Sequence, residues 1–226
     1  NTGTGWTYSS SWSMPADQYE IKYAAKTGAT PKTVSGQPIK ISFNTSSVNS
    51  EGSHKAIFTD VNGDGLTDAI QGRWCLSQNG CVGNTSHEFD DTFVYINNGS
   101  GFVYDSSWTL PTDQFEVDFA TASGQAGKTA NGQAIKISFN TVNNPSEGST
   151  KALLVDVNGD GLTDAVQGRW CLKDGNCLWS GVPGNELDKT YVYLNTGTGW
   201  SYSSTWSTPA DQYEIKYAAK TGATPK

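Results

Sequence analysis

Short stretches in which apolar and polar residues alternate recur along the chain. Apolar side chains occupy every second position of residues 19–23, 115–119 and 135–139, with charged or hydroxylated residues between them. A period of two predicts strands with one buried and one exposed face. No comparable stripe with the 3.6-residue period of a helix accompanies it. We therefore expect an all-β fold.

Two turn sequences indicate how these strands are connected. Asn98-Gly99 separates the apolar runs at residues 93–96 and 102–104, and Asn195-Thr196-Gly197 repeats the arrangement. An Asn-Gly pair between alternating apolar runs is a strong signal for a β-hairpin. The expected sheets are therefore antiparallel.

The sequence also repeats itself. Residues 1–32 return as residues 195–226 with three changes, Thr7/Ser201, Ser11/Thr205 and Met14/Thr208. A weaker copy lies between them, in which Trp12, Asp60 and Cys75 match Trp108, Asp156 and Cys171. A fixed period of this kind is typical of tandem structural units. We expect module A at 1–96, module B at 97–194 and the first third of a further module A at 195–226.

A repeat that begins again near the end of the sequence allows two interpretations. We expect the 226 residues to be a window on a longer tandem array. The alternative is that the last third supplies strands that complete a sheet begun at the N-terminus, as in ring-closing propellers. The sequence leaves both open.

An acidic loop occurs once in each module. Residues 60–68 read Asp-Val-Asn-Gly-Asp-Gly-Leu-Thr-Asp and recur unchanged as residues 156–164. Oxygen-bearing side chains stand at the first, third, fifth and ninth positions, the sixth is a glycine that permits a sharp turn, and the seventh offers a carbonyl oxygen. Ca²⁺ prefers such oxygen ligands, whereas Mg²⁺ seldom uses an all-protein cage. A cation would also relieve repulsion among the carboxylates. The spacing predicts two Ca²⁺ sites, one in each complete module.

The loop begins like an EF-hand and then departs from it. A glutamine, Gln71 or Gln167, stands where a bidentate glutamate is required, and the residues that follow it suggest a strand. The chain instead resembles the FG-GAP or VCBS type of calcium-binding β-propeller repeat, in an Asp-x-Asn-x-Asp-Gly-x-x-Asp loop between strands and a later Tyr-Leu-Asn-x-Gly-x-Gly-Phe/Trp hairpin. The matching segments are 55–68 with 95–102, and 151–164 with 193–200.

This resemblance implies propeller-blade-like antiparallel sheets and a set of calcium ligands. The implied ligands are Asp60, Asn62, Asp64, the carbonyl of Leu66 and Asp68, with Asp156, Asn158, Asp160, the carbonyl of Leu162 and Asp164 in module B. Segments 13–54 and 109–150 are longer than a blade of this family requires.

Four cysteines indicate a compartment. Cys75 and Cys81 flank one short loop, and Cys171 and Cys177 flank its counterpart. Pairing within each module is the natural choice among the three connectivities that four cysteines allow. Zinc is the competing interpretation, but His54 and His87 have no counterparts in module B. Disulfides would place the protein outside the cytosol.

Two further features suggest surface chemistry. Asn44, Asn84 and Asn98 begin Asn-x-Ser/Thr triplets, which makes them candidate glycosylation sites. Trp179 lies in an insertion found only in module B, and it is the candidate for contact with a ligand. The repeated tryptophans are expected in the core.

Charge and composition exclude several functions. The net charge is −7 and no run of Lys or Arg is present, which argues against nucleic-acid binding. The longest apolar stretch, near residues 152–155, is far below the ~20 residues of a spanning helix, so we expect no membrane insertion. We find no nucleophile with an orienting base and no catalytic carboxylate pair, and we expect no enzyme.

The sequence therefore predicts a secreted, calcium-stabilised structural protein that forms an extracellular fibre, stalk or adhesive array. Its expected partners are copies of itself, joined head to tail, together with glycans or cell-surface proteins. The alternative is a calcium-dependent β-propeller lectin or receptor-type binding module at the cell surface.

Overall fold

The computed structural model describes residues 4, 7–31, 33–41, 47–48, 52–53, 56–75, 89–124, 126–127, 129–130, 132–137, 139, 143–144, 148–149, 152–171, 187–206, 209 and 212–222. Most regular structure in this part is antiparallel β-sheet, which confirms the expected fold class at that level, but three helices accompany the sheets. None of the described helices is long and apolar enough to cross a membrane.

The first sheet has four strands that follow one another in space as they do in the chain. They are β5 (Ile57–Thr59), β6 (Asp68–Cys75), β7 (Phe89–Asn97) and β8 (Phe102–Asp105). Asn97 pairs with Phe102 across the Asn98-Gly99 turn, so the predicted hairpin is confirmed. Since β8 pairs with β7, this sheet crosses the expected module boundary at 96/97. From here on, modules A and B therefore denote the first and second main sheets, each with the helix-bearing segment that precedes it in the chain.

The second sheet repeats the first. Its strands β13 (Leu153–Val155), β14 (Asp164–Cys171), β15 (Leu187–Asn195) and β16 (Trp200–Ser203) have the same order and register. Asn195 pairs with Trp200, as Asn97 does with Phe102, which confirms the second hairpin. Two short strands, β11 (Asn143–Asn144) and β12 (Gly148–Ser149), extend the second sheet through β14.

Three small hairpins complete the described β-structure. β1 (Thr33–Val34) pairs with β2 (Gln37–Pro38), β3 (Ser47–Val48) with β4 (Gly52–Ser53), and β9 (Thr129–Ala130) with β10 (Gln133–Ala134). They lie in the long segments that precede each main sheet in the chain. In the same segment of module B, Ile137 and Phe139 are buried while Lys136 is exposed and bridges Thr112, so residues 135–137 are extended without forming a named strand.

Residues 19–23 and 115–119 are helical, so the strands predicted there are wrong. They belong to α1 (Gln18–Thr27) and α2 (Gln114–Ser123). Asp17 and Asp113 cap the helices by accepting hydrogen bonds of 3.0 Å from the amides of Tyr19 and Phe115. Gly28 and Gly124, with φ of 72° and 68°, end them in the left-handed conformation.

The alternation was ambiguous because its first and third apolar residues are four positions apart. Residues at i and i+4 lie on the same face of a helix. The rings of Tyr19 and Tyr23 stack at a centroid distance of 5.6 Å, and those of Phe115 and Phe119 at 5.9 Å. A third helix, α3 (Gln212–Thr221), has the same sequence as α1.

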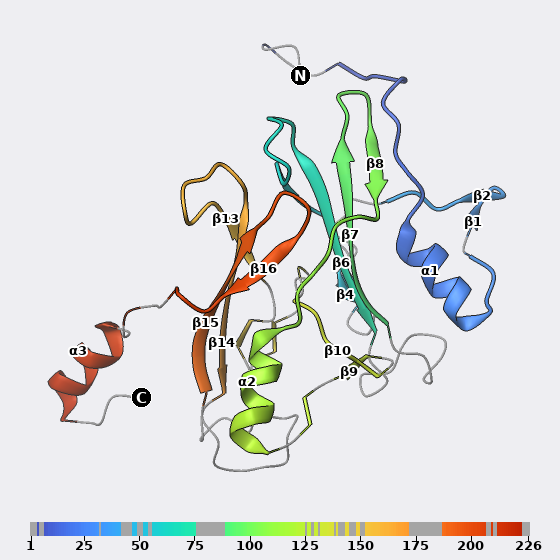
Figure 1. The fold of residues 1–226 in the computed structure, drawn as a ribbon. Helices are drawn as coiled ribbons and strands as arrows, with labels where there is room; N and C mark the ends of the chain where they lie inside the picture. The colour runs from blue at the N-terminus through green and yellow to red at the C-terminus, as the bar shows by residue number, and fades with distance from the viewer. Residues whose placement is uncertain are drawn as a thin grey trace.

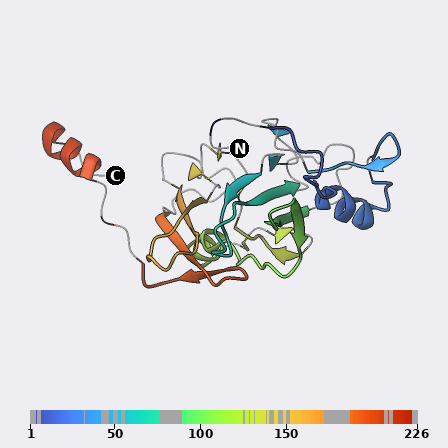
Figure 2. The same ribbon diagram turned by 90° about the horizontal axis from the view of Figure 1, so that it is seen from above.

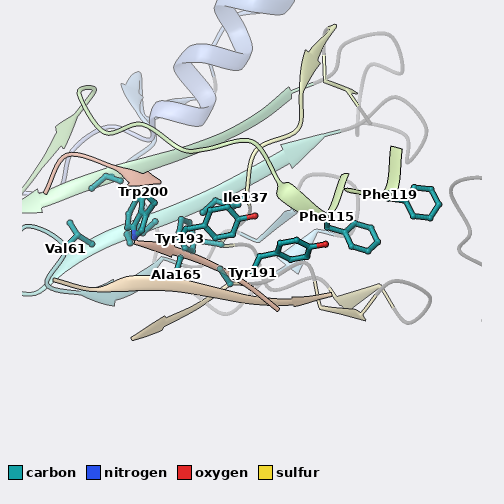
Figure 3. Close-up of a cluster of buried hydrophobic side chains, with 12 residues drawn as sticks. Val61, Phe115, Phe119, Ile137, Ala165, Tyr191, Tyr193 and Trp200 are labelled. Carbon is teal, nitrogen blue, oxygen red and sulfur yellow. The ribbon is translucent and has the colours of Figure 1, made fainter. Parts of the chain in front are cut away.

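The elements form alternating layers. α2 lies between the two sheets, α1 lies beyond the first sheet, and α3 stands away from the rest of the molecule on the far side of the second sheet (Figures 1 and 2). One hydrophobic core joins α2 to both sheets: Phe115 and Phe119 cluster with Ile70 and Val94 of the first sheet and with Tyr191 and Tyr193 of the second (Figure 3). The modules therefore share a core.

A smaller core lies on the other face of the first sheet. Its buried residues are Tyr19, Ile41, Ala69, Phe93, Tyr95 and Phe102. The segment that carries α1 thus covers one face of the first sheet, while the other face packs on module B. Every described main sheet is covered by the helix-bearing segment of its own module.

Candidate metal centre

Both acidic loops lie between the first two strands of a main sheet. The first connects β5 to β6 and the second connects β13 to β14. Gly63 and Gly65 have φ of 77° and 85°, and Gly159 and Gly161 have φ of 80° and 88°. Glycine adopts this left-handed conformation without steric cost, which explains its place at the two sharpest bends. The two loops therefore share one backbone shape.

The first carboxylate of each loop organises the turn. Asp60 Oδ1 accepts hydrogen bonds from the amides of Gly63 (2.8 Å) and Asp64 (3.2 Å), and Oδ2 accepts one from Gly65 (2.8 Å). Asp156 accepts from Gly159 (2.7 Å) and Gly161 (2.9 Å). The loops therefore close around the side chain at their first position.

The third and fifth positions of each loop are also in contact. Asn62 Nδ2 donates to Asp64 Oδ2 at 3.1 Å, and Asn158 Nδ2 donates to Asp160 Oδ2 at 2.9 Å. Asp64 Oδ1 accepts from the amide of Leu66 at 2.7 Å, and Asp160 Oδ1 from that of Leu162 at 2.8 Å. Side chains of the first, third and fifth positions are thus gathered at the exposed turn.

The ninth position is different, because its carboxylate is buried. Asp68 is fully buried, and its two oxygens accept from the amides of Val61 (3.0 Å) and Asn97 (2.8 Å). Asp164 makes the same bonds to Val157 (3.0 Å) and Asn195 (2.8 Å). These carboxylates link the start of each loop to the end of the third strand of the sheet.

The environment of Asp68 favours a nearby cation. Burial raises the pKa of its carboxyl above the ordinary value, two amide donors oppose that shift, and the charges of Asp64 and Asp60 add to it. A group whose charged form is penalised in this way gains from a positive neighbour.

The residues fit a calcium ion in the chemistry of their donors. Carboxylate, amide and carbonyl oxygens are the ligands Ca²⁺ prefers, and each carboxylate oxygen can accept more than the bond it already makes. Within the described ranges, no group of three or more His, Cys, Asp or Glu side chains converges as a metal cluster. The fit therefore rests on a mixed donor set and on small movements of exposed side chains.

The two loops lie next to each other at the boundary between the sheets. Thr163 Oγ1 donates to the carbonyl of Asp60 at 2.8 Å and lies 2.9 Å from Thr59 Oγ1. Asn195 Nδ2 donates to the carbonyls of Val61 (2.8 Å) and Thr163 (3.0 Å). The motif itself does not reveal Thr163 and Asn195 as contacts between loops. The only signal in the sequence was that Asn195 lies in the repeated hairpin.

A separate cluster of charges is buried beneath α2. Arg169 Nη1 lies 2.8 Å from Asp113 Oδ2, Nη2 lies 3.6 Å from Glu116 Oε1, and the guanidinium stands 4.0 Å from the centre of the Phe115 ring. All three charged side chains are at most 7% exposed. Burial also raises the pKa values of Tyr191 and Tyr193 far above the ordinary tyrosine range. This cluster anchors the helix N-terminus to β14.

Several predicted sites lie outside what the structure describes. These are Cys81, Cys177, Asn44, Asn84 and Trp179, together with the side chains of Cys75 and Cys171. Asn98 is described: it is exposed, and its Oδ1 accepts from the amide and hydroxyl of Ser100 at 3.0 Å. The disulfides and glycosylation sites remain predictions.

No protein-family model matches the chain, and neither a curated protein nor a solved structure shows significant similarity to it.

Proposed function

We propose that the protein is a secreted, calcium-stabilised tandem-repeat structural protein, built from FG-GAP/VCBS-type repeats and assembling into an extracellular fibre, stalk or adhesive array. The observation that carries this proposal is the position of the two acidic loops. They have the same closed shape and lie where module A meets module B.

The position of the loops supports a structural role for calcium. In each module, Asp60 or Asp156, Asn62 or Asn158, and Asp64 or Asp160 supply side-chain oxygens, Leu66 or Leu162 a carbonyl, and Asp68 or Asp164 the buried carboxylate. A bound cation neutralises this charge and fixes the turn. Because Thr163 holds the carbonyl of Asp60, a fixed turn also fixes the contact between modules.

Repetition supports an array. The two modules share one continuous core, as stacked repeats do, and the chain resumes an A-type sequence after module B. No nucleophile–base arrangement in the described residues suggests a reaction. The extracellular location rests on the predicted disulfides.

Calcium binding is the experiment that tests the proposal. Isothermal titration of the chelator-treated protein is expected to show two Ca²⁺ per chain, and calcium is expected to raise the melting temperature because it binds the folded state. Asp64→Ala and Asp160→Ala are each expected to remove one site. Asp105→Ala removes a carboxylate outside the loops and serves as the control.

Unchanged stoichiometry in both loop variants would contradict the ligand assignment. A melting temperature indifferent to chelator would contradict the stabilising role of calcium. Mg²⁺ at the same concentration distinguishes specific coordination from charge screening.

A further inference from the structure

The two sheets expose equivalent faces to different degrees. In module A, Val61 and Ile70 are fully buried because module B packs on this face. In module B, the equivalent face carries Leu153, Val155, Val157, Val166 and Leu194, which we call the outer face. Leu153 is 64% exposed and Val155 is 48% exposed. An apolar sheet face that is covered in one repeat is thus partly exposed in the next, where Val192 of the same face remains buried.

Module A carries the complementary surface. Leu162, Thr163 and Asn195 of module B contact module A, and their counterparts in module A are Leu66, Thr67 and Asn97, which we call the leading edge. Leu66 is 39% exposed and Thr67 is exposed. The leading edge of module B is engaged within the chain, whereas Leu66 and Thr67 of module A are exposed to solvent.

Hydrogen-bonding capacity follows the same division. Asn195 Nδ2 uses both hydrogens, on Thr163 O and Val61 O, whereas Asn97 Nδ2 makes, among the described residues, only the internal bond to Thr67 O at 3.0 Å. At the outer face, no donor in the described part of the chain reaches the carbonyl oxygens of Asp156 and Val157, whose counterparts Asp60 and Val61 accept from module B.

Space is available as well. An added Cβ at Gly63 would lie 3.0 Å from Leu162 Cδ2, whereas at Gly159 it would meet no atom of the described residues within 4 Å. Leu162 therefore packs over the first loop, and nothing described packs over the second in the same way. α3 also stands clear of the second sheet (Figures 1 and 2).

We infer that the outer face of module B binds the leading edge of module A in a second copy of this chain, and so reproduces the interface between modules A and B. Thr67 Oγ1 then donates to the carbonyl of Asp156, Asn97 Nδ2 donates to that of Val157, and Leu66 packs over Gly159. Because two different surfaces meet, the copy at each end of an assembly keeps one of its two surfaces free. Growth therefore continues head to tail. This inference rests on the proposed structural function and identifies the surfaces that carry it.

Sedimentation velocity over a concentration series tests the inference. The protein is measured in about 0.15 M salt with calcium, because copies with a net charge of −7 repel each other at low ionic strength. The wild-type mass is expected to rise with concentration. The outer-face variant Leu153→Glu/Val155→Glu and the leading-edge variant Thr67→Arg are each expected to stay monomeric. Val117→Glu, at a position that is 42% exposed on α2, is the matched control and is expected to assemble.

Mixing the two defective variants gives the sharpest result. One retains an intact leading edge and the other an intact outer face, so the mixture is expected to form dimers and nothing larger. Continued growth of either variant alone, or no dimer in the mixture, would overturn the inference.

A wild-type monomer whose outer face gains hydrogen exchange when residues 204–226 are deleted would also overturn the inference, and would assign the face to the chain's own C-terminal segment. Calcium stoichiometry measured on the same samples keeps the two proposals separate. Two bound Ca²⁺ in a protein that never assembles would refute the interface and leave calcium stabilisation standing.

Discussion

Lys22 and Asp118 occupy the same position in the two repeated helices and carry opposite charges. Lys22 Nζ lies 3.0 Å from Asp91 Oδ2 on β7, whereas Asp118 Oδ2 lies 2.6 Å from Lys189 Nζ on β15. The pair is conserved in place but reversed in sign. Each helix thus matches the sheet of its own module and would meet a like charge on the other sheet. Lys216 of α3 corresponds to Lys22, so α3 matches an A-type sheet.

Reversing one member of the first pair is expected to destabilise module A. Asp91→Lys places two ammonium groups together, and the expected loss is about 0.5–1 kcal/mol because both side chains are partly solvated. The double variant Lys22→Asp/Asp91→Lys recreates the arrangement of module B and is expected to recover most of the loss. Urea unfolding measures both. A double variant no more stable than Asp91→Lys alone would show that the sign of the pair is irrelevant.

The second pair predicts a dependence of stability on acid. Burial alone would raise the pKa of Asp118, but hydrogen bonds from Lys189 and Gln114 and the charge of Lys189 lower it below the ordinary 3.8. A lowered pKa stabilises the fold above the ordinary value, and this contribution is lost as pH falls through the folded-state value. The melting temperature of the wild type is expected to exceed that of Asp118→Asn near neutral pH. The two melting temperatures are expected to converge below about pH 3.8. A constant gap would contradict this.

The sequence predicted the sheets better than the helices. Hairpins were predictable because Asn-Gly and Asn-Thr-Gly turns leave few alternatives for the flanking runs. The helices were missed because the spacing of Tyr19 and Tyr23 satisfies both periods. Local end signals decide between them: Asp17 followed three residues later by Glu20 marks a helix start, and Gly28 marks an end.

The candidate site was only partly predictable for a related reason. Each loop consists of consecutive residues, so the spacing of its side chains predicts the donor oxygens. Contacts between distant segments are not local: Thr163 reaches Asp60 in module A across 103 residues, and Arg169 reaches Asp113 within module B across 56. No pattern within one stretch of sequence encodes those partners, which only the packing of the two sheets around α2 brings together.

The buried Arg169 is expected to be the costliest charged residue to remove. Arg169→Met takes away the cation that faces Asp113 and Glu116, and breaking a buried pair in this way costs about 3–5 kcal/mol. Arg169→Lys keeps the charge but loses the two-pronged geometry, so a smaller loss is expected. Chemical denaturation compares the two. Equal losses would indicate that the positive charge alone does not hold α2 to β14.

Asp68 and Asp64 are expected to differ in the absence of calcium. Asp68→Ala deprives the amides of Val61 and Asn97 of their acceptor and is expected to cost about 2–4 kcal/mol even in chelator. Asp64 is exposed, so Asp64→Ala is expected to change stability in chelator by no more than about 0.5 kcal/mol. Melting curves in chelator and in calcium separate the two roles. Equal losses in chelator would contradict a role of Asp68 in the fold that does not depend on calcium.

Gly101 allows the segment that precedes α1 to pair with the turn between β7 and β8. Ser13 and Gly101 form a parallel bridge, in which the amide of Ser13 donates to Ser100 O and that of Phe102 donates to Ser13 O, both at 3.2 Å. An added Cβ at Gly101 would lie 2.6 Å from Ser13 O, a backbone atom that cannot rotate away. Gly101→Ala is therefore expected to cost about 1–3 kcal/mol and to abolish the exchange protection of the Phe102 amide.

Gly199→Ala is expected to act in the same way in module B, since its added Cβ would lie 2.6 Å from Thr109 O. Gly168 on β14 is the matched control, because an added Cβ there meets no atom of the described residues within 4 Å, and Gly168→Ala is expected to be neutral.

Gly101→Ala and Gly199→Ala are also expected to differ in whether they destabilise one module or both. Gly199 precedes Trp200, whose side chain lies in the core shared by both modules. Gly199→Ala is therefore expected to lower the cooperativity of unfolding of the whole chain. Unfolding followed by exchange at Phe102 and at Trp200 would detect this, and two effects confined to their own modules would show that the shared core does not couple them.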